Sequence, residues 1–354
     1  EAEVSNLRHR PVGLGIMGFQ DALYKLNINF DSQESIDFAD YSMEIISYNA
    51  ILGSSQLSKE RGAYSSYKGS KWDRCIFPID TLDLLEQERG EKIDVSRKSR
   101  LDWSIVKESV RLHGMRNSNC MAVAPTATIA NIAGCTPTIE PIYKNIYEKS
   151  NMSGEFLVTN NYLIEDLKKL GLWNMYMLDE IKKNDGQLMN IPAIPLALKA
   201  KYKETFDIDP EWLVRIAAHR GKWIDQSQSL NIFIKGSSGK RISDVYMLAW
   251  NMGLKTTYYL RSLGATGIEK STVALNKKPE TESVVVAPVV APVQAEAVLA
   301  KEIETKGVVS SVIKTVKNTV KSAMQPKVMA PQPKTTQQKL SFCKLDDPTC
   351  EACQ

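Results

Sequence analysis

A change in composition divides this chain into a part that can fold around a core and a part that cannot. The Trp and Tyr residues lie before Arg261, and no aromatic residue occurs between Glu269 and Lys339. Pro, Val, Ala, Lys and Glu dominate that second stretch. Without large side chains to bury, it cannot offset the entropy lost on ordering. We therefore predict a folded body over 1–268, a flexible, disordered linker over 269–339 and a separate tail over 340–354.

Charge and hydropathy exclude two broad classes of protein. The 354 residues include 45 basic and 41 acidic side chains, and a net charge of +4 is too small for electrostatics to dominate binding to nucleic acid or a membrane surface. No window holds the roughly 20 apolar residues of a membrane span. The N-terminal stretch lacks the apolar core of a secretion signal. We expect a globular cytoplasmic protein with no membrane partner.

Hydrophobic periodicity predicts an α/β body. Apolar residues recur at helical spacing from Ser32 to Lys59, with Asp31 or Ser32 as the N-cap. Further helices are expected over Asp21–Leu26, Lys107–Leu112, Tyr162–Leu170 and Ile242–Met252. Short β-rich runs predict strands at Cys120–Ala124, Leu230–Ile234 and Thr256–Leu260. Helices that alternate with buried strands favour a parallel arrangement.

A further helical pattern lies inside the linker, from Val308 to Ala323. Val and Ile residues occupy one face of this pattern and Lys residues the other. A partly ordered linker segment is the favoured interpretation, because β-branched residues weaken an isolated helix. Contact with a partner or a membrane surface is the alternative.

The run Gly13-Leu-Gly-Ile-Met-Gly18 has the glycine spacing of a dinucleotide-binding loop. That loop needs a hydrophobic strand directly before it, and Arg8-His9-Arg10-Pro11 stands there instead. We therefore favour a tight structural turn before a helix.

A second short motif combines a strand with small and hydroxyl-bearing residues. Met121–Ala124 is followed by Pro125-Thr-Ala-Thr-Ile-Ala-Asn-Ile, which opens a predicted helix. Free amides at a helix N-terminus, with hydroxyls beside them, can bind phosphate. Ordinary N-capping explains the same residues, so both interpretations stay open at this point.

Two adjacent phenols occur at Tyr258 and Tyr259. Packing is the usual role of such a pair. The functional alternative is the relay of a hydrogen atom, because Tyr can lose an electron and a proton together and stay neutral.

Cys350-Glu-Ala-Cys353 near the end of the chain has the spacing of a dithiol that cycles with a disulfide. Zinc binding with Cys343 as a third ligand lacks a fourth ligand and is less favoured. An incidental pair is the remaining alternative. Buried small hydrophobes are expected at the other cysteines, Cys75, Cys120 and Cys135.

Taken together, these stretches resemble the large, catalytic subunit of class I ribonucleotide reductase across much of residues 5–262. The stretches that carry the resemblance are Asn6–Gly15, Trp103 through Gly114–Ser118, Pro125–Thr128, Thr138–Pro141, Ser153–Phe156, Asp225–Asn231 and Gly253–Arg261. Val106 departs from the Leu or Phe that is usual in the family.

The resemblance implies a role for each candidate site residue. Tyr258 and Tyr259 would form the pair that relays a radical from the small subunit. Cys350 and Cys353 would be the dithiol that re-reduces the active-site disulfide and is itself reduced by thioredoxin or glutaredoxin. The segment that cradles the substrate diphosphate would comprise Pro125, Thr126, Ala127, Thr128 and Ile129.

The resemblance also implies a fold and the partners that complete it. The family fold is a ten-stranded α/β barrel, of which this chain would supply the second half. The family's radical cysteine and active-site cysteine pair lie before the stretch that matches Glu1, so we expect the isolated chain to be inactive. Its partners would be the N-terminal half of the same subunit and a metal-containing small subunit that supplies the radical. We expect no metal or cofactor on this chain itself.

The implied reaction is the reduction of ribonucleoside diphosphates to deoxyribonucleoside diphosphates for DNA synthesis. An incomplete sequence, a split gene and intein excision all remain open as the origin of the chain. Two alternative functions are part of a cobalamin-dependent reductase, which has a tail dithiol but needs no tyrosine pair, and a non-catalytic partner of the small subunit.

Overall fold

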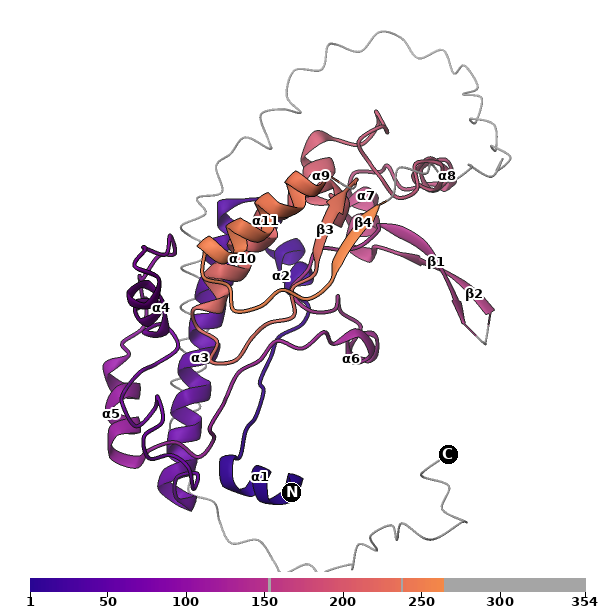
Figure 1. Ribbon diagram of the computed structural model, residues 1–354. Coiled ribbons are helices and arrows are strands. Elements are labelled where there is room, and N and C mark those ends of the chain that lie inside the picture. Colours follow the sequence, from indigo (N-terminus) through magenta and orange to yellow (C-terminus); the bar gives the residue numbers. More distant parts are fainter. Residues whose placement is uncertain (152–153, 237, 264–354) are drawn as a thin grey trace, which may run out of the picture. The chain divides into compact units, whose positions relative to one another are not determined.

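The computed structural model describes residues 1–151, 154–236 and 238–263, and Figure 1 shows their course. The predicted linker, the predicted tail and the helical pattern at 308–323 lie outside the described residues. The described part contains both helices and strands, so the predicted α/β character is confirmed. No helix in this part of the chain is both long and apolar enough to cross a membrane.

The helices predicted from periodicity are present, together with several that were not predicted. The helices are α1 (Ala2–His9), α2 (Phe19–Leu26), α3 (Gln33–Arg61), α4 (Thr81–Arg89), α5 (Ser104–His113), α6 (Ala127–Ala133), α7 (Asn161–Lys169), α8 (Met175–Lys183), α9 (Leu196–Lys201), the 3-10 helix η1 (Thr205–Asp207), α10 (Pro210–Gly221) and α11 (Gly239–Asn251). The strands are β1 (Ile146–Asn151), β2 (Gly154–Thr159), β3 (Ile232–Lys235) and β4 (Leu260–Leu263).

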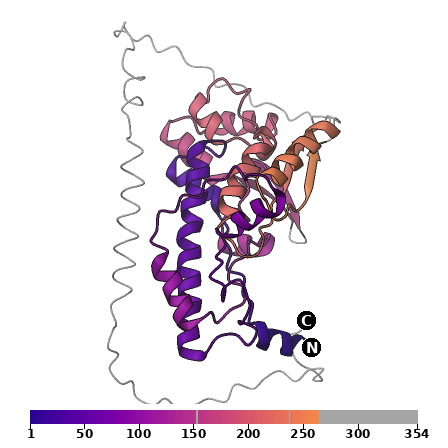
Figure 2. The same ribbon diagram turned by 60° about the vertical axis from the view of Figure 1, so that its left-hand side comes forward.

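The long helix α3 is the element against which α5 and α10 pack. It begins at the predicted cap, because the Ser32 hydroxyl accepts a hydrogen bond from the Ser35 N–H at 3.2 Å. In both views α5 lies along the C-terminal part of α3 (Figures 1 and 2). Hydrogen bonds between the two helices fix this contact, including one from the Ser58 hydroxyl to the His113 carbonyl.

A buried carboxylate ties α3 to the end of α10. Asp40 accepts hydrogen bonds from Trp223 Nε1 at 2.6 Å and from Lys222 Nζ at 2.8 Å. Burial alone would raise the pKa of Asp40, but the hydrogen bonds from His219, Lys222 and Trp223 hold it below its usual value. The Trp223 ring also stacks on Trp103, with ring centroids 5.4 Å apart. Asp40 therefore stays ionised inside the fold.

Four extended segments of the chain lie side by side in parallel. Leu14 pairs with Met121, Val123 pairs with Gln228, and β3 pairs with β4. The order across the four segments is therefore 12–15, 119–123, 226–235 and 258–263. Such an arrangement is what a parallel half-barrel requires. Within the described residues, regular pairing is confined to β3–β4 and the antiparallel hairpin β1–β2, and no closed barrel is formed.

Of the predicted strands, the one at Cys120–Ala124 is wrong and the one at Thr256–Leu260 is wrong in its limits, for the same reason. At Cys120–Ala124 only isolated bridges form, because the Asp225 carboxylate, not a backbone carbonyl, accepts the N–H groups of Cys120 and Met121. At Thr256–Leu260 the strand begins only at Leu260, because the Asn231 side chain accepts the N–H of Tyr259. Side chains replace ladder hydrogen bonds at both places.

The glycine run near the N-terminus has a packing role. Gly18 adopts a left-handed conformation with φ 74° and caps α2, which confirms the predicted turn before a helix. At Gly15 a Cβ would lie 2.3 Å from the Ala122 carbonyl oxygen. Only glycine therefore allows segment 12–15 to approach segment 119–123 this closely.

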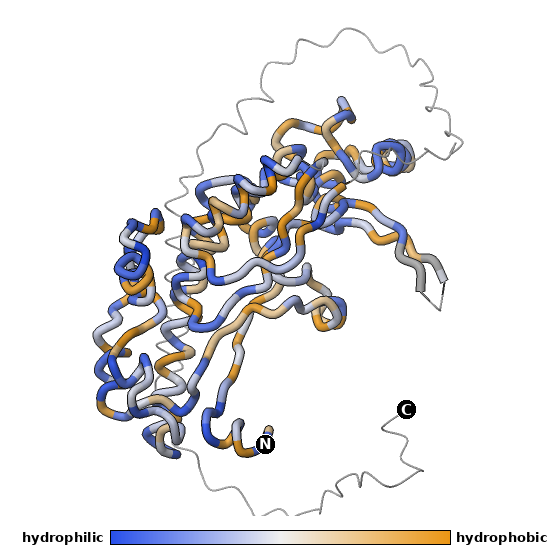
Figure 3. The backbone as a smooth tube through the Cα atoms, viewed as in Figure 1, coloured by the Kyte–Doolittle hydropathy of each residue, from blue (hydrophilic) through white to orange (hydrophobic). Residues whose placement is uncertain are grey.

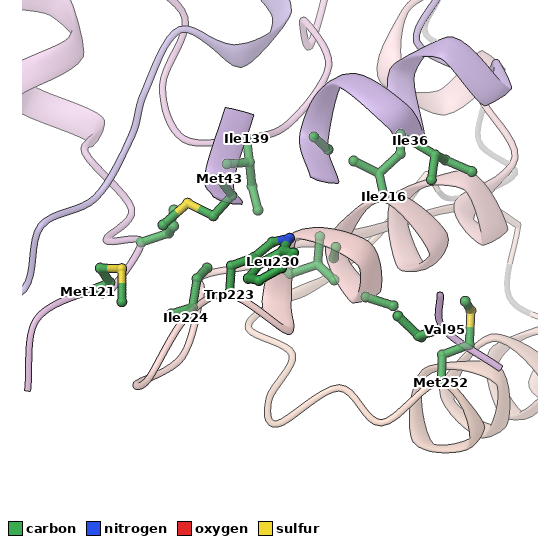
Figure 4. Close-up of a cluster of buried hydrophobic side chains, with 14 of the residues drawn as sticks. Ile36, Met43, Val95, Met121, Ile139, Ile216, Trp223, Ile224, Leu230 and Met252 are labelled. Carbon is green, nitrogen blue, oxygen red and sulfur yellow. The ribbon is translucent and has the colours of Figure 1, made fainter. Parts of the chain in front are cut away.

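The main core lies where α3, α10 and the parallel segments meet. Figure 4 shows Trp223 and Leu230 near the middle of this cluster, with Ile36 and Ile216 at the upper right and Val95 and Met252 at the lower right. The apolar residues of β3, coloured orange in Figure 3, form part of it.

A second, smaller core contains a buried polar network. Tyr24 and Tyr202 pack with ring centroids 4.9 Å apart. Beside them the Asn145 side chain donates to the Tyr202 carbonyl at 2.8 Å, and the Asn145 N–H donates to Glu204 Oε1 at 2.7 Å. Burial, helped by nearby carboxylates, raises the pKa of Glu204 to about 7. Glu204 is therefore an acid that the fold tolerates best when it is protonated.

We predict that Gly15→Ala destabilises the fold by about 1–3 kcal/mol, because the added methyl group would overlap a backbone carbonyl that cannot rotate away. The matched control is Gly53→Ala in the middle of α3, where a Cβ meets no atom within 4 Å. That variant should gain about 0.5–1 kcal/mol from helix propensity. Urea unfolding measures both, and equal effects of the two substitutions would contradict the close approach at Gly15.

We predict that Glu204→Gln raises the free energy of unfolding at pH 8 by about 1–3 kcal/mol. The pKa of Glu204 is raised from 4.5 to about 7 in the folded state, so its contribution to stability is present below pH 4.5 and is lost as the pH rises through 7. Gln keeps an acceptor for the Asn145 N–H and cannot ionise. Unfolding at pH 4.5 and pH 8 tests this, with the exposed Glu60→Gln as control. An unchanged pH dependence would show that Glu204 is not the titrating group.

Candidate functional site

The segment Pro125–Ile129 follows the end of one parallel segment and opens the seven-residue helix α6. Thr126 stands directly before the helix in a left-handed conformation with φ 49°. Pro125, Ala127, Thr128 and Ile129 are exposed. The first amides of a helix have no acceptor inside it, so this turn presents N–H groups beside the Thr128 hydroxyl.

Thr126 does not act as an ordinary N-cap. Its side chain accepts no hydrogen bond from α6, and its Oγ1 instead accepts one from the Thr138 N–H at 2.9 Å. Thr138 also has a positive φ, 52°, which is uncommon for a β-branched residue. The Thr126 hydroxyl proton remains available as a donor. The side-chain capping interpretation is therefore wrong for Thr126, and its local role is to hold the turn at Thr138.

The two tyrosines of the predicted relay are in direct contact. The ring centroids of Tyr258 and Tyr259 are 4.2 Å apart with an angle of 50° between the planes. Successive residues of a regular strand point to opposite faces, so this contact requires the irregular backbone that precedes β4. The neighbouring Tyr259 phenol raises the pKa of Tyr258. Both rings are about half exposed, with fractions of 47% and 54%.

Two residues to which the sequence assigned no role, Asn231 and Glu140, are connected to the backbone of Tyr259 by hydrogen bonds. Asn231 Oδ1 accepts a hydrogen bond from the Tyr259 N–H at 3.1 Å. The backbone N–H and the Nδ2 of Asn231 donate to the two oxygens of Glu140, at 3.0 and 3.1 Å. Both residues occur in stretches that carry the family resemblance, but nothing in the local pattern indicates that they meet.

The segment Asp225–Gln228 joins its neighbours through side chains. Asp225 accepts from the N–H groups of Cys120 and Met121 at 2.6 and 2.8 Å, and Gln226 Nε2 donates to the Val12 carbonyl at 2.8 Å. On the other side, Lys255 Nζ donates to the carbonyls of residues 224 and 226 at 2.5 and 3.0 Å. Burial lowers the pKa of Lys255 to about 8. These bonds fix the backbone that leads to the tyrosine pair.

The cysteines of the described part differ from one another. Cys120 is buried as predicted, and burial raises the pKa of its thiol to about 12. Cys135 is half-buried. Cys75 is exposed in a left-handed turn, so the prediction of a buried residue is wrong there; the apolar neighbours Ile76 and Phe77 do not make the turn itself a core position. Cys350 and Cys353 lie outside the described residues.

Metal ligands do not gather in the part of the chain that the structure describes. No group of three or more His, Cys, Asp or Glu side chains is placed to hold an ion there. What this part offers chemically is a pair of phenol rings in contact and an exposed helix start with amide and hydroxyl donors.

Comparison with known proteins identifies the family. The family described as "Ribonucleotide reductase, barrel domain" matches residues 1–260. The chain is 55% identical over 279 residues to the ribonucleoside-diphosphate reductase subunit alpha of Chlamydia trachomatis, covering 78% of this chain and 27% of that protein. It is 36% identical to the large subunit from Acanthamoeba polyphaga mimivirus, covering 80% of this chain and 31% of that protein.

A solved structure supports the same fold. The class Id ribonucleotide reductase alpha subunit of Actinobacillus ureae superposes with a TM-score of 0.55 at 24% identity, covering 73% of this chain and 40% of that chain. The chain thus spans about a quarter to a third of the length of the curated relatives that it matches. The expectation of the second part of a ribonucleotide reductase barrel is confirmed at the level of the fold, and the chain belongs to the ribonucleotide reductase barrel-domain family.

Proposed function

We propose that this chain is the C-terminal part of a catalytic subunit that reduces ribonucleoside diphosphates to deoxyribonucleoside diphosphates by radical chemistry. The observation that carries the proposal is the contact between Tyr258 and Tyr259, with their ring centroids 4.2 Å apart. In a relay, one O–H bond breaks as the other forms, so a hydrogen atom moves while each ring stays neutral. Membership of the barrel-domain family supports this use of the pair.

The substrate diphosphate would bind at Pro125–Ile129. The exposed first turn of α6 supports this assignment, since its amides have no partner within the helix and can bind anionic oxygens without a Lys or Arg. In our proposal Thr128 donates its hydroxyl to the diphosphate. Thr126 does so too, while its oxygen accepts the Thr138 N–H.

The remaining chemistry belongs to partners and to the tail. Cys350 and Cys353 would carry electrons from thioredoxin or glutaredoxin to the active-site disulfide, as their spacing indicates. The N-terminal half of the subunit would supply the radical cysteine. A metal-containing small subunit would generate the radical, so this chain would bind no cofactor of its own. We propose that the assembly works in the cytoplasm.

We predict that Tyr258→Phe or Tyr259→Phe abolishes turnover in the complete catalytic subunit with its small subunit. Phe keeps the ring and its packing but has no O–H bond to exchange. The variants should still bind ribonucleoside diphosphate with wild-type affinity. Turnover assays and equilibrium binding test this together. Full turnover in both variants would favour a reductase that generates its radical without a path between subunits.

We predict different effects for the two threonines of the substrate segment. Thr126→Val should cost about 1–3 kcal/mol of stability, because it leaves the Thr138 N–H without its acceptor, and should also weaken diphosphate binding through the lost hydroxyl donor. Thr128→Val should leave stability unchanged and weaken diphosphate binding roughly 10- to 100-fold, as expected for one lost hydrogen bond to a charged group. Thermal unfolding and binding titrations separate these effects. Unchanged affinity in Thr128→Val would exclude the hydroxyl as a phosphate ligand.

A further inference from the structure

Glu140 lies on a stretch of chain that hydrogen bonds connect to both parts of the candidate site, the turn at Thr126 and, through Asn231, the backbone of the tyrosine pair. It lies on the connection after α6, and it is half-buried. Its two carboxylate oxygens accept from two different donors of Asn231, the backbone N–H and the side-chain Nδ2. Burial raises the pKa of Glu140, and the Asn231 hydrogen bonds and the charge of Arg261 oppose this effect.

The carboxylate determines which way the Asn231 amide points. An amide side chain has one donor end and one acceptor end of nearly the same shape, so its neighbours decide its orientation. An ionised carboxylate accepts but cannot donate, so Glu140 requires the NH₂ end of Asn231 to face it. The oxygen of Asn231 then faces the Tyr259 N–H, which it accepts at 3.1 Å. A flipped amide would place two donors against each other at Tyr259.

The same connection reaches the start of α6. Two residues before Glu140, Thr138 donates its N–H to Thr126 Oγ1 at 2.9 Å. Ile139 between them is 2% exposed and is packed in the main core. The turn that holds Thr126 and the carboxylate that orients Asn231 therefore belong to one short, anchored stretch of chain.

We propose that Glu140 and Asn231 are positioning residues that hold the Tyr258–Tyr259 pair in register with the Thr126 segment. The inference rests on the proposed function for its catalytic meaning. Its structural content is the orientation of one amide and the backbone position of Tyr259. Neither residue touches substrate or carries the radical in this account.

The test uses a reciprocal exchange in the complete catalytic subunit with its small subunit. Glu140→Gln replaces one acceptor by an NH₂ group, so it can no longer accept from both Asn231 donors. Asn231→Asp places a second carboxylate against Glu140. The exposed Glu165→Gln is the matched control.

The double variant Glu140→Gln/Asn231→Asp restores a complementary pair, because the new amide donates its NH₂ group to the new carboxylate. The direction of the side-chain hydrogen bond is then reversed. The amide oxygen at position 140 can still accept the backbone N–H of residue 231, and the carboxylate at position 231 can still accept the Tyr259 N–H. Both contacts that place the tyrosine backbone are therefore available in the double variant.

Each single variant should lower kcat about 10-fold or more while KM for the diphosphate changes less than about threefold. The double variant should return kcat to within about threefold of the wild type. A purely structural role would show only as a loss of stability, which unfolding curves of the same proteins measure. If the single variants keep wild-type kcat, or if a double variant of normal stability fails to recover it, the positioning role is excluded.

A second readout does not depend on turnover. With 3-fluorotyrosine at position 259, the ¹⁹F resonance should shift in each single variant and return to the wild-type position in the double variant. If the wild-type assembly has no reductase activity, the proposed function fails, and the ¹⁹F shifts still decide whether Glu140 and Asn231 position the ring. Identical ¹⁹F spectra in the wild type and the three variants would overturn the inference.

Discussion

The structure depends on hydrogen bonds that side chains of Asp225–Asn231 make to the backbone of neighbouring parallel segments. Parallel strands are joined by long connections, so nothing local in the sequence sets their register. Asp225 sets it on one side by accepting the N–H groups of Cys120 and Met121. Asn231 sets it on the other by accepting the N–H of Tyr259. As a result, the hydrogen-bonded pairing of β3 with β4 is short. The backbone before β4 is irregular, and this irregularity allows the rings of Tyr258 and Tyr259 to make contact.

Away from the candidate site, two buried carboxyl groups, Asp40 and Glu204, also join distant parts of the chain through hydrogen bonds. Asp40 joins α3 to the end of α10 through Lys222 and Trp223, and removing one partner would leave the other charge buried and unpaired. Glu204 accepts the backbone N–H of Asn145, and its raised pKa shows that the smaller core tolerates the acid without needing its charge. The same fold therefore contains one carboxylate that must be ionised and one that is best protonated.

The sequence predicted those features that depend on local pattern. The helix cap at Ser32 and the turn at Gly18 both follow from residue types at fixed offsets. The strand predictions near Cys120 and Tyr259 were wrong because side chains distant in sequence, those of Asp225 and Asn231, accept the backbone N–H groups there. Glu140 and Asn231 are 91 residues apart, and no periodicity predicts that they meet. The roles of the tyrosine pair and of the substrate segment came from the family resemblance rather than from spacing.

We propose that this chain is one part of a radical reductase and completes its active site only with the rest of the catalytic subunit. The direct measurement is the formation of deoxyribonucleoside diphosphate by the purified chain, alone and after addition of the N-terminal half, the small subunit and thioredoxin. The account predicts no product from the chain alone and turnover from the reconstituted assembly. Product formed by the isolated chain would contradict it.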